Sequence, residues 1–252
     1  MTGPPVVELD DVSFAYVSGP AWSRVRTPLL RGLSLTIGAG EMVGLVGESG
    51  SGKSTIGKLC LGMARPSAGQ VRFAGEPMPR KRLPGSLAVV LQHPQWSLNP
   101  RLTVGRSVAE PLALTGVPRA ERRGRMAEML TQVRLDPALA DRYPNQLSGG
   151  QRQRVSIARA LVAEPRFVLF DEAVSALDVS IQAQILNLVK RLQKQHRFGA
   201  VFISHDLAAT RYVSDRILVM RQGSIVDEGS AEQFYRPAHH EYTRRLQLAS
   251  DV

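Results

Sequence analysis

The chain has 252 residues, 43% of them hydrophobic, which is enough to bury the core of one large domain or of two small ones. It has no run of about 18 apolar residues that would span a membrane, and its acidic first residues do not resemble a secretory signal. A net charge of +10 fits a solvated basic face, attraction for nucleotides or binding to an anionic membrane surface. Nucleic acid is a less favoured partner, because no aromatic residues are interleaved with the basic clusters at 80–82, 119–125 and 244–245.

Short strands are predicted first along the chain. Apolar runs bounded by glycine and polar residues indicate strands at 6–16, 29–37, 41–47, 70–75 and 87–92. A helix is expected over about 53–63, after a glycine-rich turn. This helix contains Cys60, and because Cys60 is the only cysteine of the chain, an intrachain disulfide is excluded. From about Pro100 to Pro144 the pattern turns helical, which indicates a helical subdomain inserted between strands.

Helices and strands alternate after this insertion. We expect a helix from Gly149 to about Ala163 and then the apolar run FVLF, typical of a strand buried on both faces of a parallel sheet. A helix at 181–195, a strand at 199–204, a short helix and a strand at 215–220 follow. This order predicts an α/β fold.

A phosphate-binding loop is predicted between the third strand and the first helix. The segment GESGSGKST fits the pattern G-x-x-x-x-G-K-[ST], in which backbone N–H groups and a helix N-terminus face phosphate oxygens. The lysine would reach the β- and γ-phosphates, and the serine after it would ligate Mg²⁺. The loop residues are Gly47, Glu48, Ser49, Gly50, Ser51, Gly52, Lys53, Ser54 and Thr55.

Polar side chains follow three predicted strands. Asp171 and Glu172 end FVLFDE, where Asp171 would hold Mg²⁺ and Glu172 would accept the proton of an attacking water. His205 follows the strand at 199–204, which suggests a γ-phosphate contact, and Gln92 could touch the metal or the water. Each of these residues also has a structural interpretation, such as a capped turn or a packed histidine.

The order of these pieces resembles that of the ATP-binding cassette (ABC) ATPases, over about Val7 to Leu246. The resemblance implies an α/β phosphate-loop fold with a mixed sheet core, an N-terminal antiparallel β subdomain and an inserted helical subdomain. It also implies a single ATPase domain over 1–252, with a RecA-like core and β subdomain at about 1–97 and 160–252 and the helical signature subdomain at about 98–159.

The segment LSGGQ carries the most specific part of this resemblance. In the family this loop caps the ATP of a second cassette in a head-to-tail dimer, so Ser148, Gly149, Gly150 and Gln151 would meet a nucleotide across the interface. Asp178, in SALD, would lie at the same interface. Tyr16 matches the aromatic that stacks on adenine, although it could also be an ordinary strand tyrosine. The second cassette would be an identical or a different chain.

The resemblance further implies an importer subunit at the cytoplasmic face of the inner membrane, with two separate membrane permeases and an extracytoplasmic substrate-binding protein. The segments QHPQWSLNPRLTV and DEAVSALDVSIQAQ are similar to the oligopeptide/nickel branch. Ala173-Val174 and GEPM favour nickel or a metal chelate over a peptide substrate, although the five histidines, including His239-His240, form no metal cluster of their own. A non-transport cassette ATPase and a non-hydrolysing regulator are the remaining alternatives.

Overall fold

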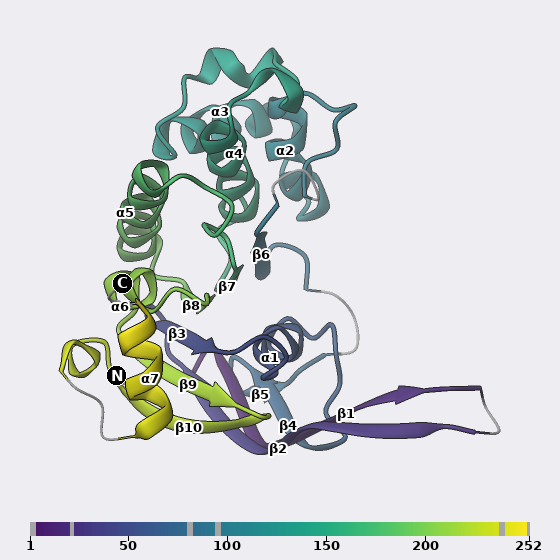
Figure 1. Ribbon diagram of the computed structural model, residues 1–252. Coiled ribbons are helices and arrows are strands. Elements are labelled where there is room, and N and C mark those ends of the chain that lie inside the picture. Colours follow the sequence, from purple (N-terminus) through teal and green to yellow (C-terminus); the bar gives the residue numbers. More distant parts are fainter. Residues whose placement is uncertain (1–3, 21–22, 80–82, 94–96, 237–239, 251–252) are drawn as a thin grey trace. The chain divides into compact units, whose positions relative to one another are not determined.

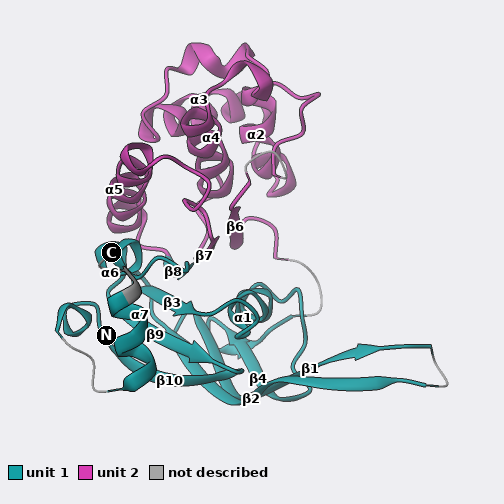
Figure 2. Cartoon of the chain, in the orientation of Figure 1, with its two compact units in different colours: residues 1–82, 199–252 teal, residues 83–198 magenta. Residues whose placement is uncertain are grey.

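The computed structural model describes residues 4–20, 23–79, 83–93, 97–236 and 240–250 (Figure 1). The basic cluster at 80–82, residues 94–96 of the QHPQWSLNPRLTV segment, and His239 lie outside these ranges. The chain divides into two compact units, residues 1–82 with 199–252 and residues 83–198 (Figure 2). Across the described ranges, no helix combines the length and the apolar character that a membrane crossing requires.

An antiparallel sheet forms the N-terminal part of the first unit. Its strand order is β2-β1-β4-β5, and β1 pairs with both β2 and β4. The expected antiparallel β subdomain is therefore present. The two-residue β5 was not predicted, because its two exposed residues carry no strand pattern. The strands are β1 (Val7–Ser18), β2 (Val25–Ile37), β4 (Ala68–Phe73) and β5 (Glu76–Pro77).

A second, mixed sheet forms the core of the same unit. Strand β3 pairs in parallel with β8 and β9, and β10 pairs with β9 in antiparallel fashion. Every residue of β3 and β8 is buried, which fits the largely apolar sequences of both strands. This confirms the mixed sheet that the sequence predicted. The strands are β3 (Met42–Gly47), β8 (Gly199–Ile203), β9 (Arg216–Arg221) and β10 (Ser224–Ser230).

The described residues of this unit also form helices α1 (Lys53–Cys60), α6 (Leu207–Val213) and α7 (Glu241–Ser250), with a 3-10 turn at Gln233–Tyr235. Helix α1 ends three residues before the predicted Met63, since Gly62 follows with a left-handed φ of 65°. Helix α6 packs closely on β3, because a Cβ at Gly44 would lie 2.3 Å from the Thr210 side chain.

The second unit combines a pair of parallel strands with helices. Helix α2 packs against α3 and α4, and α4 also contacts β6. The helical pattern predicted between Pro100 and Pro144 is confirmed by α2 and α3, whereas the predicted subdomain boundaries of about 98–159 fall inside this larger unit. The elements are β6 (Leu87–Leu91), β7 (Phe167–Asp171), α2 (Val104–Leu114), α3 (Arg119–Gln132), α4 (Gly149–Leu161), α5 (Val179–His196) and 3-10 turns at Pro137–Asp141 and Pro144–Gln146.

Candidate functional site

The predicted phosphate loop joins β3 to α1 in the first unit. Gly47 has φ 144°, and a Cβ there would lie 2.2 Å from the Met220 carbonyl oxygen, so only glycine lets β3 run this close to β9. Gly50, at the exposed tip, has φ 78°, a left-handed conformation that also favours glycine. The loop glycines are therefore required by backbone geometry, as the motif predicts.

Lys53 is buried at the start of α1, and loop carbonyls hold its ammonium group. Its Nζ donates to the carbonyl oxygens of Gly47 and Glu48 at 2.6 and 2.8 Å. Ser51 lies 3.4 Å from the same nitrogen through its hydroxyl, and its own carbonyl accepts a hydrogen bond from Gly223 N. The loop carbonyls thus hold the lysine ammonium, and the turn after β9 contacts the loop through the Gly223–Ser51 hydrogen bond. Ser54, the next residue, has an exposed side chain.

Tyr16 lies beside helix α1, which follows the phosphate loop. Its hydroxyl is 3.1 Å from the Thr55 hydroxyl, and the residue is 48% exposed. Phe14 meets this ring edge-on, with 5.1 Å between the centroids. The first strand therefore presents an accessible aromatic face next to the phosphate loop, which is the arrangement that adenine stacking needs.

His205 leaves the mixed sheet at the same edge as the phosphate loop. Strand β8 pairs in parallel with β3, and Ile203 lies opposite Leu45. Since parallel strands end at one edge, His205 and Gly47 each emerge two residues beyond this pair. The His205 side chain is exposed. Its predicted place at the carboxyl end of a sheet strand is therefore correct.

In the second unit, two strand ends bring the predicted amide and carboxylates together. Strands β6 and β7 are parallel, with Leu91 opposite Asp171. Gln92 and Glu172 therefore follow at neighbouring positions just beyond the two strands. Four buried residues precede the half-buried Asp171, so the carboxylate emerges where the apolar strand ends.

Glu172 has an unusual backbone conformation. Its φ is 50°, in the left-handed region that non-glycine residues rarely occupy. Its carbonyl oxygen accepts hydrogen bonds from the Ser175 backbone N–H and hydroxyl at 3.2 and 3.0 Å. Such conformations cost about 1–3 kcal/mol and cluster at functional sites. The surrounding turn therefore fixes the direction in which this carboxylate leaves the strand.

The LSGGQ segment forms the start of α4. Ser148 is the N-cap: its hydroxyl accepts from Gln151 N at 3.2 Å, and Gln151 Oε1 accepts from Ser148 N at 2.9 Å. This reciprocal pair is a capping box, a pattern that S-x-x-Q could have indicated. Gly149 is exposed, while Gly150 is buried against α5, where a Cβ would lie 2.9 Å from Ile181 Cγ2.

Asp178 immediately precedes α5, which contacts α4 in the same unit. Its side chain is exposed and makes no capping hydrogen bond, although its carbonyl accepts from Ile181 N and Gln182 N. A helix-starting aspartate normally caps with its side chain. The carboxylate of Asp178 is thus not used for the local structure that its position would suggest.

Two buried residues that the sequence did not indicate make hydrogen bonds to the segment after Glu172 and to the phosphate loop. Gln153, on α4 and 1% exposed, donates from Nε2 to the Ala173 carbonyl oxygen at 2.7 Å, directly after Glu172. In the first unit, the Tyr242 hydroxyl on α7 accepts from Glu48 N at 3.0 Å. No local pattern marks either contact, since both join segments far apart in the sequence.

Strand β3 of the mixed sheet leads through a glycine-rich turn into helix α1, which carries the buried lysine. This arrangement defines a phosphate-loop nucleotide-binding protein. A family model described as "ABC transporter" matches residues 30–175, more than half of the chain. The chain therefore belongs to the ABC transporter family, and it is an ABC-type ATPase domain of these ATP-hydrolysing transport proteins.

Relatives with curated names support the same assignment. The chain is 42% identical to the oligopeptide transport ATP-binding protein OppF of Escherichia coli over 252 residues, which cover 96% of this chain and 75% of that protein. It is 43% identical to the di/tripeptide transport ATP-binding protein DppF of Pseudomonas aeruginosa over 228 residues, covering 88% and 71%.

Solved structures show the same fold. The chain matches cbiO1 of Clostridium perfringens, part of the ABC transporter complex cbiONQ, with a TM-score of 0.82 and 26% identity over 97% of this chain and 95% of that one. It also matches the ATP-binding cassette MJ0796, a dimer bound to ADP and phosphate, with a TM-score of 0.75 and 31% identity over 89% and 98%.

Proposed function

We propose that this chain is the ATP-hydrolysing subunit of an importer that takes up di- or oligopeptides. The observation that carries this proposal is the likeness to OppF and DppF, both named for peptide transport, over nearly the whole chain. The nickel substrate favoured by Ala173-Val174 and GEPM has no such support, and the peptide alternative is therefore the better one. The energy for transport would come from ATP bound at the phosphate loop.

The binding of ATP would use residues of the first unit. The backbone and Lys53 would hold the phosphates, and the exposed ring of Tyr16 would stack on adenine. His205, at the same sheet edge as the loop, would contact the γ-phosphate. This assignment is supported by the buried position of Lys53 and by the proximity of Tyr16 to Thr55.

Hydrolysis would use Mg²⁺ and a general base. Ser54, Gln92 and Asp171 are hard oxygen donors with a single carboxylate among them, which suits Mg²⁺ because this ion keeps several waters and binds phosphate as well. Bound Mg²⁺ would neutralise charge that develops on the phosphates. Glu172, separate from this donor set, would accept the proton of the attacking water.

The signature segment would act on the nucleotide of a second cassette. Ser148 and Gly150, at the start of α4, and the uncapped Asp178 would lie at the contact between two cassettes arranged head to tail. The dimeric state of MJ0796 bound to ADP and phosphate supports a contact between two cassettes. Two membrane permeases and an extracytoplasmic binding protein would complete the importer, with this subunit at the cytoplasmic face of the membrane.

Uptake in cells whose only copy carries Lys53→Ala tests the proposal. We expect loss of labelled-peptide uptake and unchanged uptake of radioactive nickel, with or without a chelator. Lys58→Ala is the matched control, since Lys58 is exposed on the same helix. Selective loss of nickel uptake would restore the metal substrate, and unchanged uptake of both would favour a non-transport ATPase.

A further inference from the structure

We propose that Tyr242 is a positioning residue for the phosphate loop and that, through it, the C-terminal helix α7 sets the affinity for nucleotide phosphates. The inference rests on the proposed function, in which ATP binds at this loop. It adds a residue that lies 194 positions from the loop in the sequence and outside every motif considered above.

Two side chains hold one peptide group of the phosphate loop, one at each end. The peptide between Gly47 and Glu48 donates its N–H to the Tyr242 hydroxyl at 3.0 Å. The carbonyl of the same peptide accepts from Lys53 Nζ at 2.6 Å. Rotation of this peptide plane would break both hydrogen bonds, so the tyrosine hydroxyl and the lysine ammonium fix its orientation together.

The orientation of this peptide matters because phosphate loops bind through their backbone. Gly47 has no side chain to restrain it, and its φ of 144° is accessible to few other residues. With the Tyr242 bond lost, the peptide would keep the bond from the Lys53 ammonium, which is the group that must reach the phosphates. The loop would then sample orientations that do not bind phosphate, which lowers the affinity.

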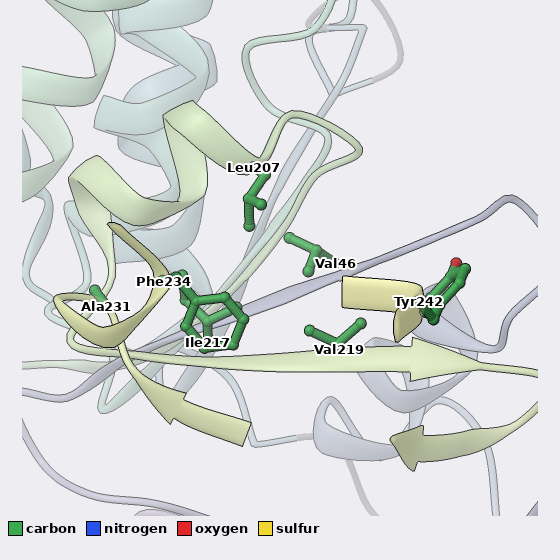
Figure 3. Close-up of a cluster of buried hydrophobic side chains, with 7 residues drawn as sticks. All are labelled: Val46, Leu207, Ile217, Val219, Ala231, Phe234 and Tyr242. Atoms are coloured by element: carbon green, nitrogen blue, oxygen red, sulfur yellow. The ribbon is translucent and has the colours of Figure 1, made fainter. Parts of the chain in front are cut away.

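Tyr242 is itself rigidly held by its surroundings. Its side chain is 6% exposed and belongs to a cluster of buried residues with Val46, on β3, and Val219, on β9 (Figure 3). The Arg221 guanidinium lies 5.1 Å from the centroid of its ring. A hydroxyl on so well packed a ring can restrain a loop, whereas one on a surface tyrosine could not.

Helix α7 is anchored at two positions that follow Tyr242 along the helix. The Thr243 hydroxyl, fully buried, donates to Asp227 Oδ2 on β10 at 2.6 Å. One turn later, Gln247 Nε2 donates to the Phe234 and Arg236 carbonyl oxygens at 3.0 and 2.9 Å. Displacement of α7 would therefore move the Tyr242 hydroxyl, which links the C-terminal segment to nucleotide binding.

The test removes one atom from the full chain. Tyr242→Phe deletes the hydroxyl and keeps the packed ring, and we expect the Kd for ADP and the KM for ATP to rise by about three- to ten-fold, the effect of losing one hydrogen bond. The apparent kcat should change less than KM. Tyr235→Phe is the matched control, because that ring is 63% exposed and lies outside the cluster.

A second pair of variants tests the anchor of the helix. Thr243→Val removes the bond to Asp227 and should weaken ADP binding in the same direction, whereas Thr243→Ser keeps a hydroxyl and should restore it. ADP binding by Tyr242→Phe within twofold of the unaltered chain would overturn the proposal, even if the melting temperature fell. Lys53→Ala separates the two hypotheses: if that variant hydrolyses ATP normally, the proposed function itself fails.

Discussion

Gln153 offers a sharp test of how helix α4 supports the turn at Glu172, the proposed general base. Its Nε2 donates to the Ala173 carbonyl, while its Oε1, also buried, has no hydrogen-bond partner among the described residues. Gln153→Leu therefore has two opposed effects on stability. The Ala173 carbonyl loses its donor, which costs about 1–3 kcal/mol, and an unpartnered buried oxygen disappears, which returns a similar amount.

The two effects should nearly cancel in Gln153→Leu. We expect the free energy of unfolding to stay within about 1 kcal/mol and the melting temperature within about 4 °C of the unaltered protein. The turn that begins at Glu172 nevertheless loses its link to α4. Because small displacements of a reacting group are costly, kcat for ATP hydrolysis should fall roughly tenfold or more.

Calorimetry and steady-state ATP hydrolysis measure the two quantities on the same preparation. Gln153→Glu is the contrasting variant, since a carboxylate facing the Ala173 carbonyl is buried without a donor and should destabilise by several kcal/mol. A Leu variant with unchanged kcat would show that this hydrogen bond does not position Glu172. A Leu variant that lost as much stability as the Glu variant would refute the compensation.

Glu172→Gln should still bind ATP but lose turnover, as measured by nucleotide binding and phosphate release; retained hydrolysis would exclude it as the base. Burial raises the pKa of the Cys60 thiol to about 12, so a thiol reagent at pH 8 should label it only after unfolding. The unfolded thiol ionises near its ordinary pKa of 9.0, so its contribution to stability is present below pH 9 and decreases as the pH rises towards 12, which denaturant titrations can follow. Gly44→Ala should destabilise by about 1–3 kcal/mol in chemical denaturation, because its Cβ would meet Thr210 at 2.3 Å; an unchanged midpoint would contradict this packing.

The fold was predictable where burial leaves a continuous pattern. Strands β3, β7 and β8 are apolar because they are buried on both faces, and their sequences show it directly. Strand β10 was not predicted, because its residues SIVDEGS are only partly buried and mix charges with a glycine. Helix α7 was not predicted because two of its buried residues, Thr243 and Gln247, are polar, so its buried face shows little apolar periodicity.

The site divides in the same way between local and distant determinants. The phosphate loop and FVLFDE are each a contiguous stretch of sequence whose residue order indicates its chemistry, so both could be predicted from the sequence. The capping box of Ser148 and Gln151 was also readable but was overlooked. By contrast, the contacts of Gln153 and Tyr242 depend on which segments the tertiary fold brings together, so the spacing of residues in the sequence does not indicate them.

The capping box has a consequence for the choice of residue at the start of the signature helix. An aspartate or asparagine would cap α4 as well as a serine does. Ser148, however, accepts the Gln151 N–H through a lone pair and keeps its own proton to donate. On the proposed function, one hydroxyl can therefore hold its helix and face an anion at once, whereas an aspartate cap would repel that anion. In the proposed dimer, the serine would let the cassette contact a neighbour's nucleotide without unwinding the helix that carries it.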